Sequence, residues 1–130
     1  MRGGTLLRSL EDISANPQRY VAADILNLPF SGGTFDMATC FSFLTSFEVD
    51  HPEFVREALI EVLRTIRRGG NLRVGPNEFK LEGGESGRRT EANLKAAFEE
   101  AKRLKIVEKI SRYSIGDGMV WYNISRSRKR

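Results

Sequence analysis

Between residues 36 and 74, a helix pattern stands between two short apolar runs, and few folds accommodate this order. The first run, DMATCFSF, has the composition of a central strand. The helix is predicted over about residues 51–68, and residues 71–74 are predicted to form a second short strand. Strands that alternate with helices favour a mostly parallel sheet with helices on both faces.

The central helix has start and stop signals in the sequence. Asp50 and Glu53 match a capping box, and Pro52 suits the first turn. Gly69 and Gly70 are predicted to end the helix. The apolar residues that recur at helical spacing, and so are expected to face inward, are Phe54, Ala58, Leu59, Val62 and Ile66.

Two further elements are predicted upstream of this unit. Apolar residues recur at helical spacing from Leu6 to Ile13, and Asn16-Pro17 ends that pattern. Residues 20–23 are then predicted as a short buried strand, which Asp24 closes. The following segment, LNLPFSGGTF, contains the proline and glycines of a loop.

A loop, a helix and a hairpin are predicted downstream. The loop covers residues 76–89, and the helix covers about residues 90–104. Residues 106–115 and 119–125 flank Gly116-Asp117-Gly118, which is typical of a tight turn between antiparallel strands. The side chains of the second helix that are expected to face inward are Leu94, Ala97, Phe98, Ala101 and Leu104.

The positive charge of the chain is concentrated at its end. The net charge is +4, from 21 basic and 17 acidic residues. Arg126, Arg128, Lys129 and Arg130 supply this excess, so the rest of the chain is neutral. We therefore expect one domain over residues 1–125 and a disordered basic tail over residues 126–130. A nucleic-acid-binding domain more often carries its basic residues on a folded face, which argues against nucleic acid as a partner.

The composition excludes several other classes of protein. Hydrophobic residues make up 40% and charged residues 29%, which is typical of a globular domain. No apolar run approaches the ~20 residues needed to cross a bilayer, so no membrane association is expected. Cys40 is the single cysteine and His51 the single histidine, which argues against an internal disulfide and a zinc site. A lone cysteine suits a reducing cytosol, so a cytoplasmic location is expected.

Two segments together resemble a known family. AADILNLPFSGGTFDMATCFSFL is followed by EFVREALIEVLRTIRRGGNLRVGPN. This order is similar to the central run of class I S-adenosylmethionine-dependent methyltransferases. That family typically shows an acidic residue, a Leu-Pro-Phe loop, a Phe-Asp pair entering a strand, and a helix ending in Arg-x-x-x-x-Gly-Gly. The resemblance covers roughly residues 5–125 and implies a Rossmann-like α/β fold with a carboxyl-terminal antiparallel hairpin.

The resemblance also implies S-adenosylmethionine as cofactor and a set of residues that bind it. Asp24 matches the acid that accepts a hydrogen bond from the adenine amino group, and the backbone of Ile25 would face the ring. Leu26 and Leu28 would flank the adenine. Cys40 and Phe41, at the end of the second strand, match positions near the methionine part of the cofactor. The residues by themselves leave another reading of Asp24 open, as a helix cap or turn cap in the following loop.

The sequence departs from the family pattern in two respects. The family's first strand, glycine-rich turn, following helix and second strand have no counterpart in the printed sequence, so the fold is expected to be truncated at its amino end. Family members often place a histidine or an aromatic residue where Thr45 and Ser46 stand here. No catalytic residue is assigned for this reason.

The sequence alone leaves three functions open. The chain is a methyltransferase domain or fragment that acts on an unknown acceptor, a non-catalytic relative that binds a protein partner, or a nucleic-acid-associated protein. The first two are separated by the missing glycine-rich turn, and the charge distribution argues against the third. In addition, an apolar central strand without its family neighbours would expose an open edge, so we expect self-association, a partner subunit or a rearranged sheet.

Overall fold

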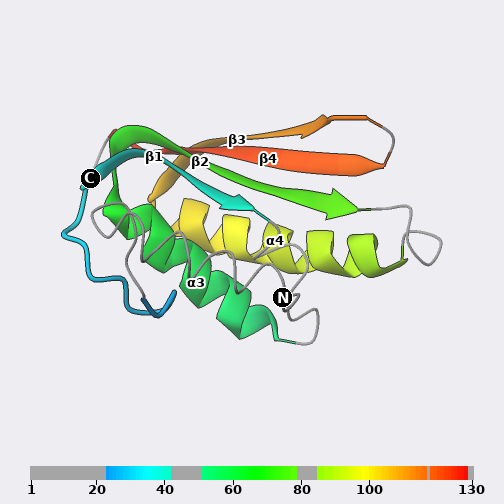
Figure 1. The fold of residues 1–130 in the computed structure, drawn as a ribbon, viewed down its shortest axis with the longest axis horizontal. Coiled ribbons are helices and arrows are strands. Elements are labelled where there is room, and N and C mark those ends of the chain that lie inside the picture. The colour runs from blue at the N-terminus through cyan, green and yellow to red at the C-terminus, as the bar shows by residue number, and fades with distance from the viewer. Residues whose placement is uncertain (1–22, 42–50, 79–84, 117, 129–130) are drawn as a thin grey trace, which may run out of the picture.

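The computed structural model describes residues 23–41, 51–78, 85–116 and 118–128. The expected strand at residues 20–23 and the expected helix from Leu6 to Ile13 therefore lie almost entirely outside the described residues. The elements, shown in Figure 1, are β1 (Phe35–Phe41), α3 (Pro52–Thr65), β2 (Ile66–Glu78), α4 (Glu85–Arg103), β3 (Val107–Ser114) and β4 (Met119–Arg126).

The four described strands form one mixed sheet in the order β1-β2-β4-β3. β1 pairs in parallel with β2, whereas β4 is antiparallel to both β2 and β3. It follows that β1, β2 and β3 run in the same direction and β4 runs against them. The expected Rossmann-like α/β architecture with a carboxyl-terminal antiparallel hairpin is confirmed.

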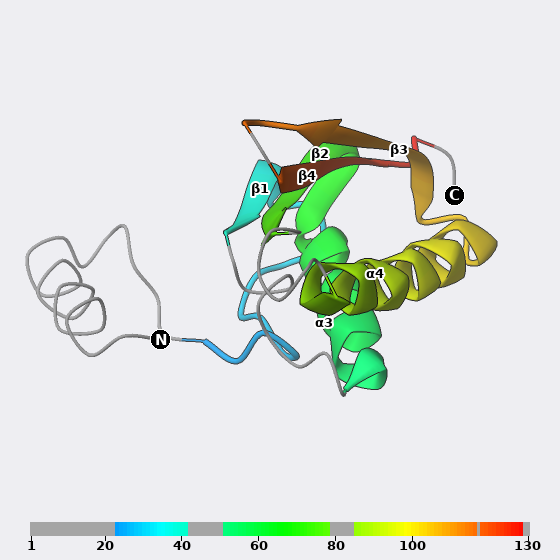
Figure 2. The ribbon, with the colours of Figure 1, turned by 90° about the vertical axis from the view of Figure 1, so that its right-hand side faces the viewer.

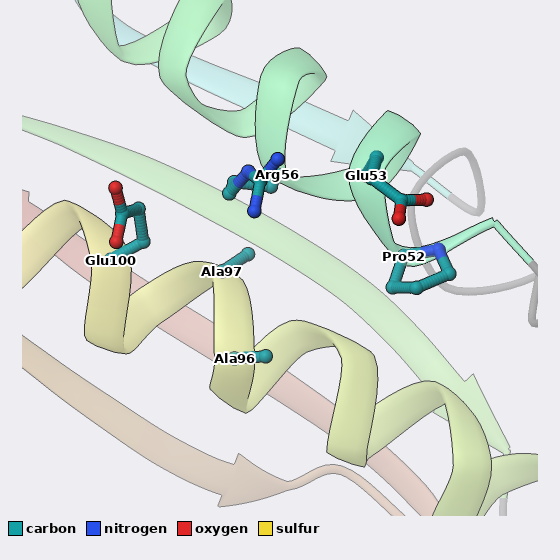
Figure 3. Close-up of a pocket in the computed structure, with 6 residues that line it drawn as sticks. All are labelled: Pro52, Glu53, Arg56, Ala96, Ala97 and Glu100. Carbon is teal, nitrogen blue, oxygen red and sulfur yellow. The ribbon is translucent and has the colours of Figure 1, made fainter.

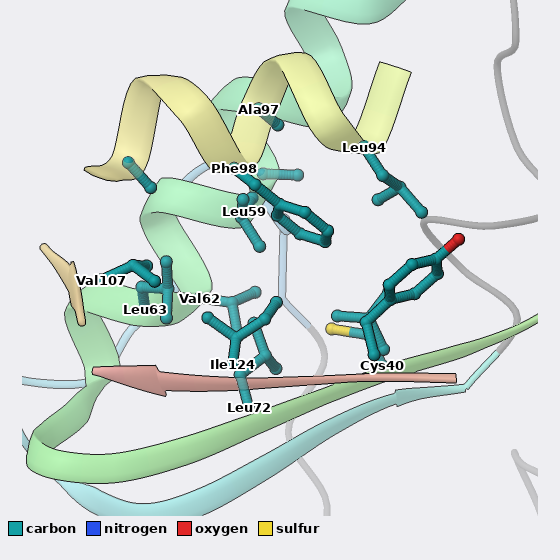
Figure 4. Close-up of a cluster of buried hydrophobic side chains, with 14 of the residues drawn as sticks. Cys40, Leu59, Val62, Leu63, Leu72, Leu94, Ala97, Phe98, Val107 and Ile124 are labelled. Atoms are coloured by element: carbon teal, nitrogen blue, oxygen red, sulfur yellow. The ribbon is translucent and has the colours of Figure 1, made fainter. Parts of the chain in front are cut away.

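Both described helices cover the same face of the sheet, as Figure 2 shows from the side. Buried apolar side chains fill the space between these two layers (Figure 4). In β2 and β4 the buried residues alternate along the strand, because successive side chains point to opposite faces. Helices on the other face were also expected, but among the described residues that face carries none.

The first helix differs from its prediction at both ends. His51 is the residue at its N-cap, and its side chain makes no capping hydrogen bond. Asp50, the expected cap, lies outside the described residues. The helix ends at Thr65, and Ile66 already has extended backbone angles. Ala58, Leu59, Val62 and Ile66 are buried as expected, while Phe54 is half-buried.

Gly69 and Gly70 lie in β2 and do not end the helix. The pairing of β1 with β2 is irregular here, since Phe35 pairs with Ile66 but Met37 pairs with Asn71. A Cβ atom on Gly70 would lie 2.5 Å from the carbonyl oxygen of Asp36, and Gly69 has a φ of +80°. The two glycines therefore let β2 bulge close to β1.

The second helix begins five residues earlier than predicted, at Glu85. Gly87 is part of this helix, and Pro76 belongs to β2, so the expected loop is shorter at both ends. Leu94, Ala97, Phe98 and Ala101 are buried as expected. Leu104 is 45% exposed, contrary to its prediction. The helix stops before it, and Lys105 turns the chain away with a φ of 62°.

The hairpin is close to its prediction. β3 and β4 pair in antiparallel register from Val107 opposite Arg126 to Ser114 opposite Val120. Gly116 and Gly118 have φ angles of 68° and 75°, which glycine adopts without strain. This turn chemistry explains why the hairpin could be recognised in the sequence.

Arg126 belongs to the folded body, so the boundary expected after residue 125 is wrong. It is the last residue of β4, and its guanidinium donates hydrogen bonds to the carbonyl oxygens of Arg64 and Ile66 at the end of α3. The backbone N–H of Ser127 also donates to the carbonyl oxygen of Ile106, at 2.7 Å. Of the expected tail, residues 129–130 lie outside the described residues.

We predict that Arg126→Ala lowers the free energy of unfolding by about 1–3 kcal/mol, because it removes the donor to two carbonyl groups at the end of a helix. Urea denaturation would measure the change. Arg128→Ala is the matched control, since Arg128 is exposed and its loss should cost less than ~0.5 kcal/mol. Equal effects of the two substitutions would contradict the role given to Arg126.

Candidate functional site

The carboxyl ends of β1 and β2 lie at one edge of the sheet, because the two strands are parallel. β1 ends at Phe41 and β2 at Glu78, and α3 and α4 begin after them in the chain. In open α/β sheets, ligands bind beyond the carboxyl ends of the strands. This edge is therefore the region in which to look for a site.

Asp24 closes a tight turn. Its backbone oxygen accepts a hydrogen bond from the N–H of Asn27 at 2.9 Å, and its Oδ1 atom accepts one from the N–H of Leu26, also at 2.9 Å. The residue is exposed, and in the described part of the chain Leu26 is the one donor to its carboxylate. The turn-cap reading of Asp24 is thus confirmed, and its second carboxylate oxygen stays accessible to a ligand.

The apolar residues after Asp24 divide into two sets. Ile25 and Leu28 are half-buried and pack against the core. Leu26 is 39% exposed. Of the side chains predicted to flank an adenine ring, that of Leu26 is therefore the most available, while Ile25 could contribute its backbone as predicted.

A carboxylate on α3 holds the loop that follows. Glu61 accepts a hydrogen bond from the backbone N–H of Leu28 at 2.6 Å. The same carboxylate accepts two from Arg64, from its Nε and NH2 atoms, each at 2.8 Å. A two-pronged arginine–carboxylate pair of this kind fixes the orientation of both groups.

Arg64 also binds the loop, through carbonyl oxygens of the loop backbone. Its NH1 atom donates to the carbonyl oxygen of Phe30 at 2.9 Å, and its NH2 atom donates to that of Leu28 at 3.1 Å. Its own carbonyl oxygen accepts a hydrogen bond from the N–H of Gly33 at 3.0 Å. We call Glu61 and Arg64, with these bonds to the loop, the Glu61–Arg64 clamp.

The clamp gives the Leu-Pro-Phe motif a physical basis that the sequence did not reveal. An acid and an arginine three residues apart on a helix are common, and they indicate no particular partner. The partners here are backbone groups more than thirty positions away. In this structure the motif is thus the segment that α3 recognises through main-chain hydrogen bonds.

The clamp also shifts the titration of its acid. The hydrogen bonds from Arg64 lower the pKa of Glu61, with the N–H of Leu28 adding to the effect and partial burial opposing it. The side chain of Glu61 is 15% exposed and that of Arg64 is 41% exposed. Glu61 therefore stays ionised well into the acid range, as a clamp that depends on its negative charge requires.

Cys40 lies in the core, on the helix-covered face of β1 (Figure 4). Burial raises the pKa of its thiol to about 11, so the group is a neutral, unreactive thiol at ordinary pH. Any contact of Cys40 with a cofactor would be made by its backbone. Phe41 is the last residue of β1 and stands at the carboxyl end, as predicted.

A second hydrogen-bonded group lies at the carboxyl end of β2 and was not predicted. The amide nitrogen of buried Asn77 donates to the carbonyl oxygen of Gly87 at 3.0 Å, within α4. It also lies 3.4 Å from the hydroxyl of Tyr122, which donates to Glu91 at 2.6 Å. Arg112 donates to the same carboxylate oxygen at 2.6 Å. These bonds hold the start of α4 against the sheet.

The charges in this second group are arranged for stability and not for proton transfer. Burial and the bond to Glu91 raise the pKa of Tyr122 to about 12. Burial alone would raise the pKa of Glu91, but hydrogen bonds from Tyr122 and Arg112 outweigh it and lower that pKa. Both groups therefore keep one protonation state near neutral pH, so neither is suited to act as a general acid or base.

A hollow of about 150 Å³ lies between α3 and α4 (Figure 3). None of the residues predicted to bind the cofactor lines it. It is bordered by Pro52, Glu53, Arg56, Ala96, Ala97 and Glu100. With few apolar side chains around it, the hollow has little of the character of a small-molecule site.

Two other kinds of feature were sought in the described residues. No helix there is long and apolar enough to span a bilayer. Nor do three or more His, Cys, Asp or Glu side chains gather there as the ligands of a metal ion would.

Comparison with known proteins decides the family. The model of the methyltransferase domain family matches residues 5–74, which is more than half of the chain. The chain belongs to the methyltransferase domain family. The match contains the Asp24 turn, the clamped loop, β1 and α3, so the site described above is built from family elements. No curated protein matches the sequence at a significant level.

Solved structures show the same fold at low sequence identity. A SAM-dependent methyltransferase of Methanosarcina mazei has a TM-score of 0.54 and 15% identity, over 81% of this chain and 65% of that one. A SAM-dependent methyltransferase of Thermotoga maritima has a TM-score of 0.54 and 17% identity, over 88% and 69%. A protein of Pyrococcus horikoshii has a TM-score of 0.63 and 13% identity, over 97% and 70%. The methyltransferase domain thus spans about two thirds of each of these structures.

We predict that Glu61→Gln lowers the stability of this methyltransferase domain at neutral pH by ~1 kcal/mol, after allowing for the solvent around half-exposed Arg64. The pKa of Glu61 is lowered by folding, so its contribution is complete above the unfolded pKa of ~4.3 and is lost as the pH falls through the folded pKa. The difference from the wild type should therefore shrink below about pH 4.

Thermal unfolding followed at several pH values would measure this difference. Glu57→Gln, one turn earlier on α3 at an exposed position, is the control and should behave like the wild type. A gap between Glu61→Gln and the wild type that stayed constant down to pH 3 would show that the charge of Glu61 does not matter.

Proposed function

We propose that the protein is an S-adenosylmethionine-dependent methyltransferase domain, or a fragment of one, acting on an acceptor that is not identified. The observation that carries the proposal is the clamped loop. The Glu61–Arg64 clamp fixes the segment between the Asp24 turn and β1, and the family match covers this whole region. A loop held this firmly presents its exposed groups in one geometry, as ligand binding requires.

The residues present suit the adenine end of the cofactor. Asp24 offers a carboxylate oxygen that could accept a hydrogen bond from the adenine amino group, and Leu26 offers an exposed apolar surface for the ring. Ile25 would contribute its backbone, while Cys40 and Phe41 would contribute backbone groups at the end of β1. This assignment extends the family resemblance to this chain residue by residue.

The cofactor, when bound, would supply a methyl group on a positively charged sulfur for attack by a nucleophile of the acceptor. The chain's own part is to hold and orient it, since the rate of such a transfer depends on alignment. No catalytic residue is proposed, because the positions of interest, Thr45 and Ser46, lie outside the described residues.

The chain alone is expected to bind the cofactor weakly and to have little methyltransferase activity. In the family, a glycine-rich turn and a second acid hold the methionine and ribose, and no residue of this chain is assigned either role. Each missing charge-assisted hydrogen bond corresponds to ~1.5–3 kcal/mol, so several together amount to many powers of ten in affinity. A partner that supplied these contacts would restore binding.

The alternative is a non-catalytic methyltransferase-like domain that binds a protein partner. The exposed apolar side chains of Phe35 and Met37 on β1 favour it. The two functions differ in their response to the cofactor. In a non-catalytic methyltransferase-like domain, cofactor binding would not depend on Asp24.

We also propose a cytoplasmic location, supported by the single, buried Cys40. A membrane or nucleic acid partner is not part of the proposal. The neutral charge of residues 1–125 supports this choice.

Calorimetric titration with S-adenosylhomocysteine tests the proposal. We expect a dissociation constant well above ~10 μM for the wild-type chain and still weaker binding for Asp24→Ala. Asp24→Asn keeps an acceptor for the Leu26 N–H and loses the charge, so it should lie between the two.

Asp36→Ala is the matched control, because Asp36 is an exposed acid that pairs with Arg67 at the start of β1. It should leave the titration unchanged. Micromolar binding by the wild-type chain would contradict the expected weakness. Indifference of binding to Asp24→Ala would overturn the adenine assignment.

A further inference from the structure

The carbonyl groups at the end of α3 find their hydrogen-bond donors in two different places. The last carbonyl groups of a helix have no partner among the backbone groups of the helix itself. In α3 the carbonyl oxygen of Val62 accepts from the hydroxyl of Thr65 at 2.7 Å. That of Leu63 accepts from the N–H of Ile66, directly after the helix. The carbonyl oxygen of Arg64 is bonded instead by two groups from distant parts of the chain.

These two donors come from the loop before β1 and from β4. The N–H of Gly33 donates to the carbonyl oxygen of Arg64 at 3.0 Å. The NH1 atom of Arg126 donates to the same oxygen at 3.2 Å, and it also donates to the carbonyl oxygen of Ile66. Arg126 therefore joins the last turn of α3 to the first residue of β2 and to the end of β4.

The backbone around Arg126 is itself held by the sheet. Arg126 lies opposite Val107 in the pairing of β3 with β4. The next residue, Ser127, donates its N–H to the carbonyl oxygen of Ile106 at 2.7 Å. The side chain of Arg126 thus extends from a fixed strand end, and the residue is half-buried, which reduces the competition of water for its bonds.

Arg64 passes this constraint on to the loop. Its carbonyl oxygen binds Gly33, its NH1 atom binds Phe30 and its NH2 atom binds Leu28. All three bonds start from one residue in the last turn of α3, so a shift of that turn would disturb all of them. Helix ends fray readily, and the last turn is therefore the part of α3 that most needs an outside attachment.

We propose that Arg126 is a positioning residue for the candidate cofactor loop, residues 24–34. It acts through Arg64, because it holds the end of α3 in the place from which Arg64 binds the loop. The last strand of the sheet thereby controls a loop near the other end of the described chain. The inference rests on the proposed function in one respect, namely that this loop binds the cofactor.

A purely stabilising role for Arg126 makes a different prediction. A side chain that only stabilises the whole fold changes the exchange of amides that open by global unfolding. Amides in a surface loop open locally, so their exchange changes only when their own attachment is altered. The two roles therefore differ at the amide of Gly33, which is bonded to Arg64.

Amide hydrogen exchange of the full chain, measured by NMR, tests the positioning role. In Arg126→Ala the Gly33 amide should exchange at least about tenfold faster than in the wild type, which corresponds to the loss of one hydrogen bond. The Ile115 amide is the internal reference. It is bonded to the carbonyl oxygen of Met119 at 2.9 Å, at the far end of the hairpin, and should exchange at an unchanged rate.

Two further variants accompany this comparison. Arg128→Ala is the matched control, because Arg128 is exposed and follows the end of β4, and it should leave the Gly33 amide as in the wild type. Arg126→Lys keeps the charge but not the planar fork of donors, so the exchange rate at Gly33 should lie between those of the wild type and Arg126→Ala. If Arg126→Ala failed to fold, Arg126→Lys would decide.

Titration with S-adenosylhomocysteine separates this inference from the proposed function. Arg126→Ala should bind at least about threefold more weakly than the wild type, because its loop is less preorganised, whereas Arg128→Ala should bind equally. If exchange at Gly33 changes as expected but the wild type binds no S-adenosylhomocysteine, the positioning role stands and the proposed function fails.

Two results would overturn the positioning role whether or not the chain binds the cofactor. The first is a Gly33 amide that exchanges at the same rate in the wild type and in the folded Arg126 variants. The second is an equal acceleration at Gly33 and Ile115, which would show that Arg126 only stabilises the whole fold.

Discussion

The ion pair between Glu61 and Arg64 determines how the amino-terminal part of the described fold is arranged. Two hydrogen bonds join the side chains of Glu61 and Arg64 to each other. Three more join these side chains, which lie on one turn of α3, to the backbone of the Leu-Pro-Phe segment. The carbonyl oxygen of Arg64 then binds Gly33, shortly before β1 begins. The same carbonyl oxygen also accepts a bond from Arg126 of β4. The end of α3 is thus the point where the loop, β2 and β4 meet.

The sequence revealed the elements whose signals are local. The helical spacing of Ala58, Leu59 and Val62 predicted α3, and the glycines around residue 117 predicted the hairpin. It did not reveal features that depend on distant partners. Gly69 and Gly70 have the appearance of a helix stop, and only the approach of β1 shows that they form a bulge. The Glu61–Arg64 clamp joins positions more than thirty residues apart, and no single-sequence pattern reports such a pairing.

The candidate site could be predicted in part for the same reason. The sequence predicts Asp24 as an acid that closes a strand and either binds a ligand or caps a turn, and the structure shows that it caps the turn with one oxygen. These two roles are compatible, because a carboxylate has more acceptor positions than the turn uses. For Cys40 the position in the strand was predicted, but its burial moves any ligand contact to the backbone. The group around Asn77 was missed because it is assembled from β2, α4, β3 and β4.

Through Glu61, α3 holds the candidate cofactor loop in place by the N–H of Leu28. Amide hydrogen exchange measured by NMR tests it most directly. The Leu28 amide should exchange slowly in the wild type, as the buried amides of α3 do. In Glu61→Ala this amide should exchange at the rate of an unprotected loop while Leu63 stays protected. Fast exchange at Leu28 in the wild type, or unchanged protection in Glu61→Ala, would show that Glu61 does not hold the loop.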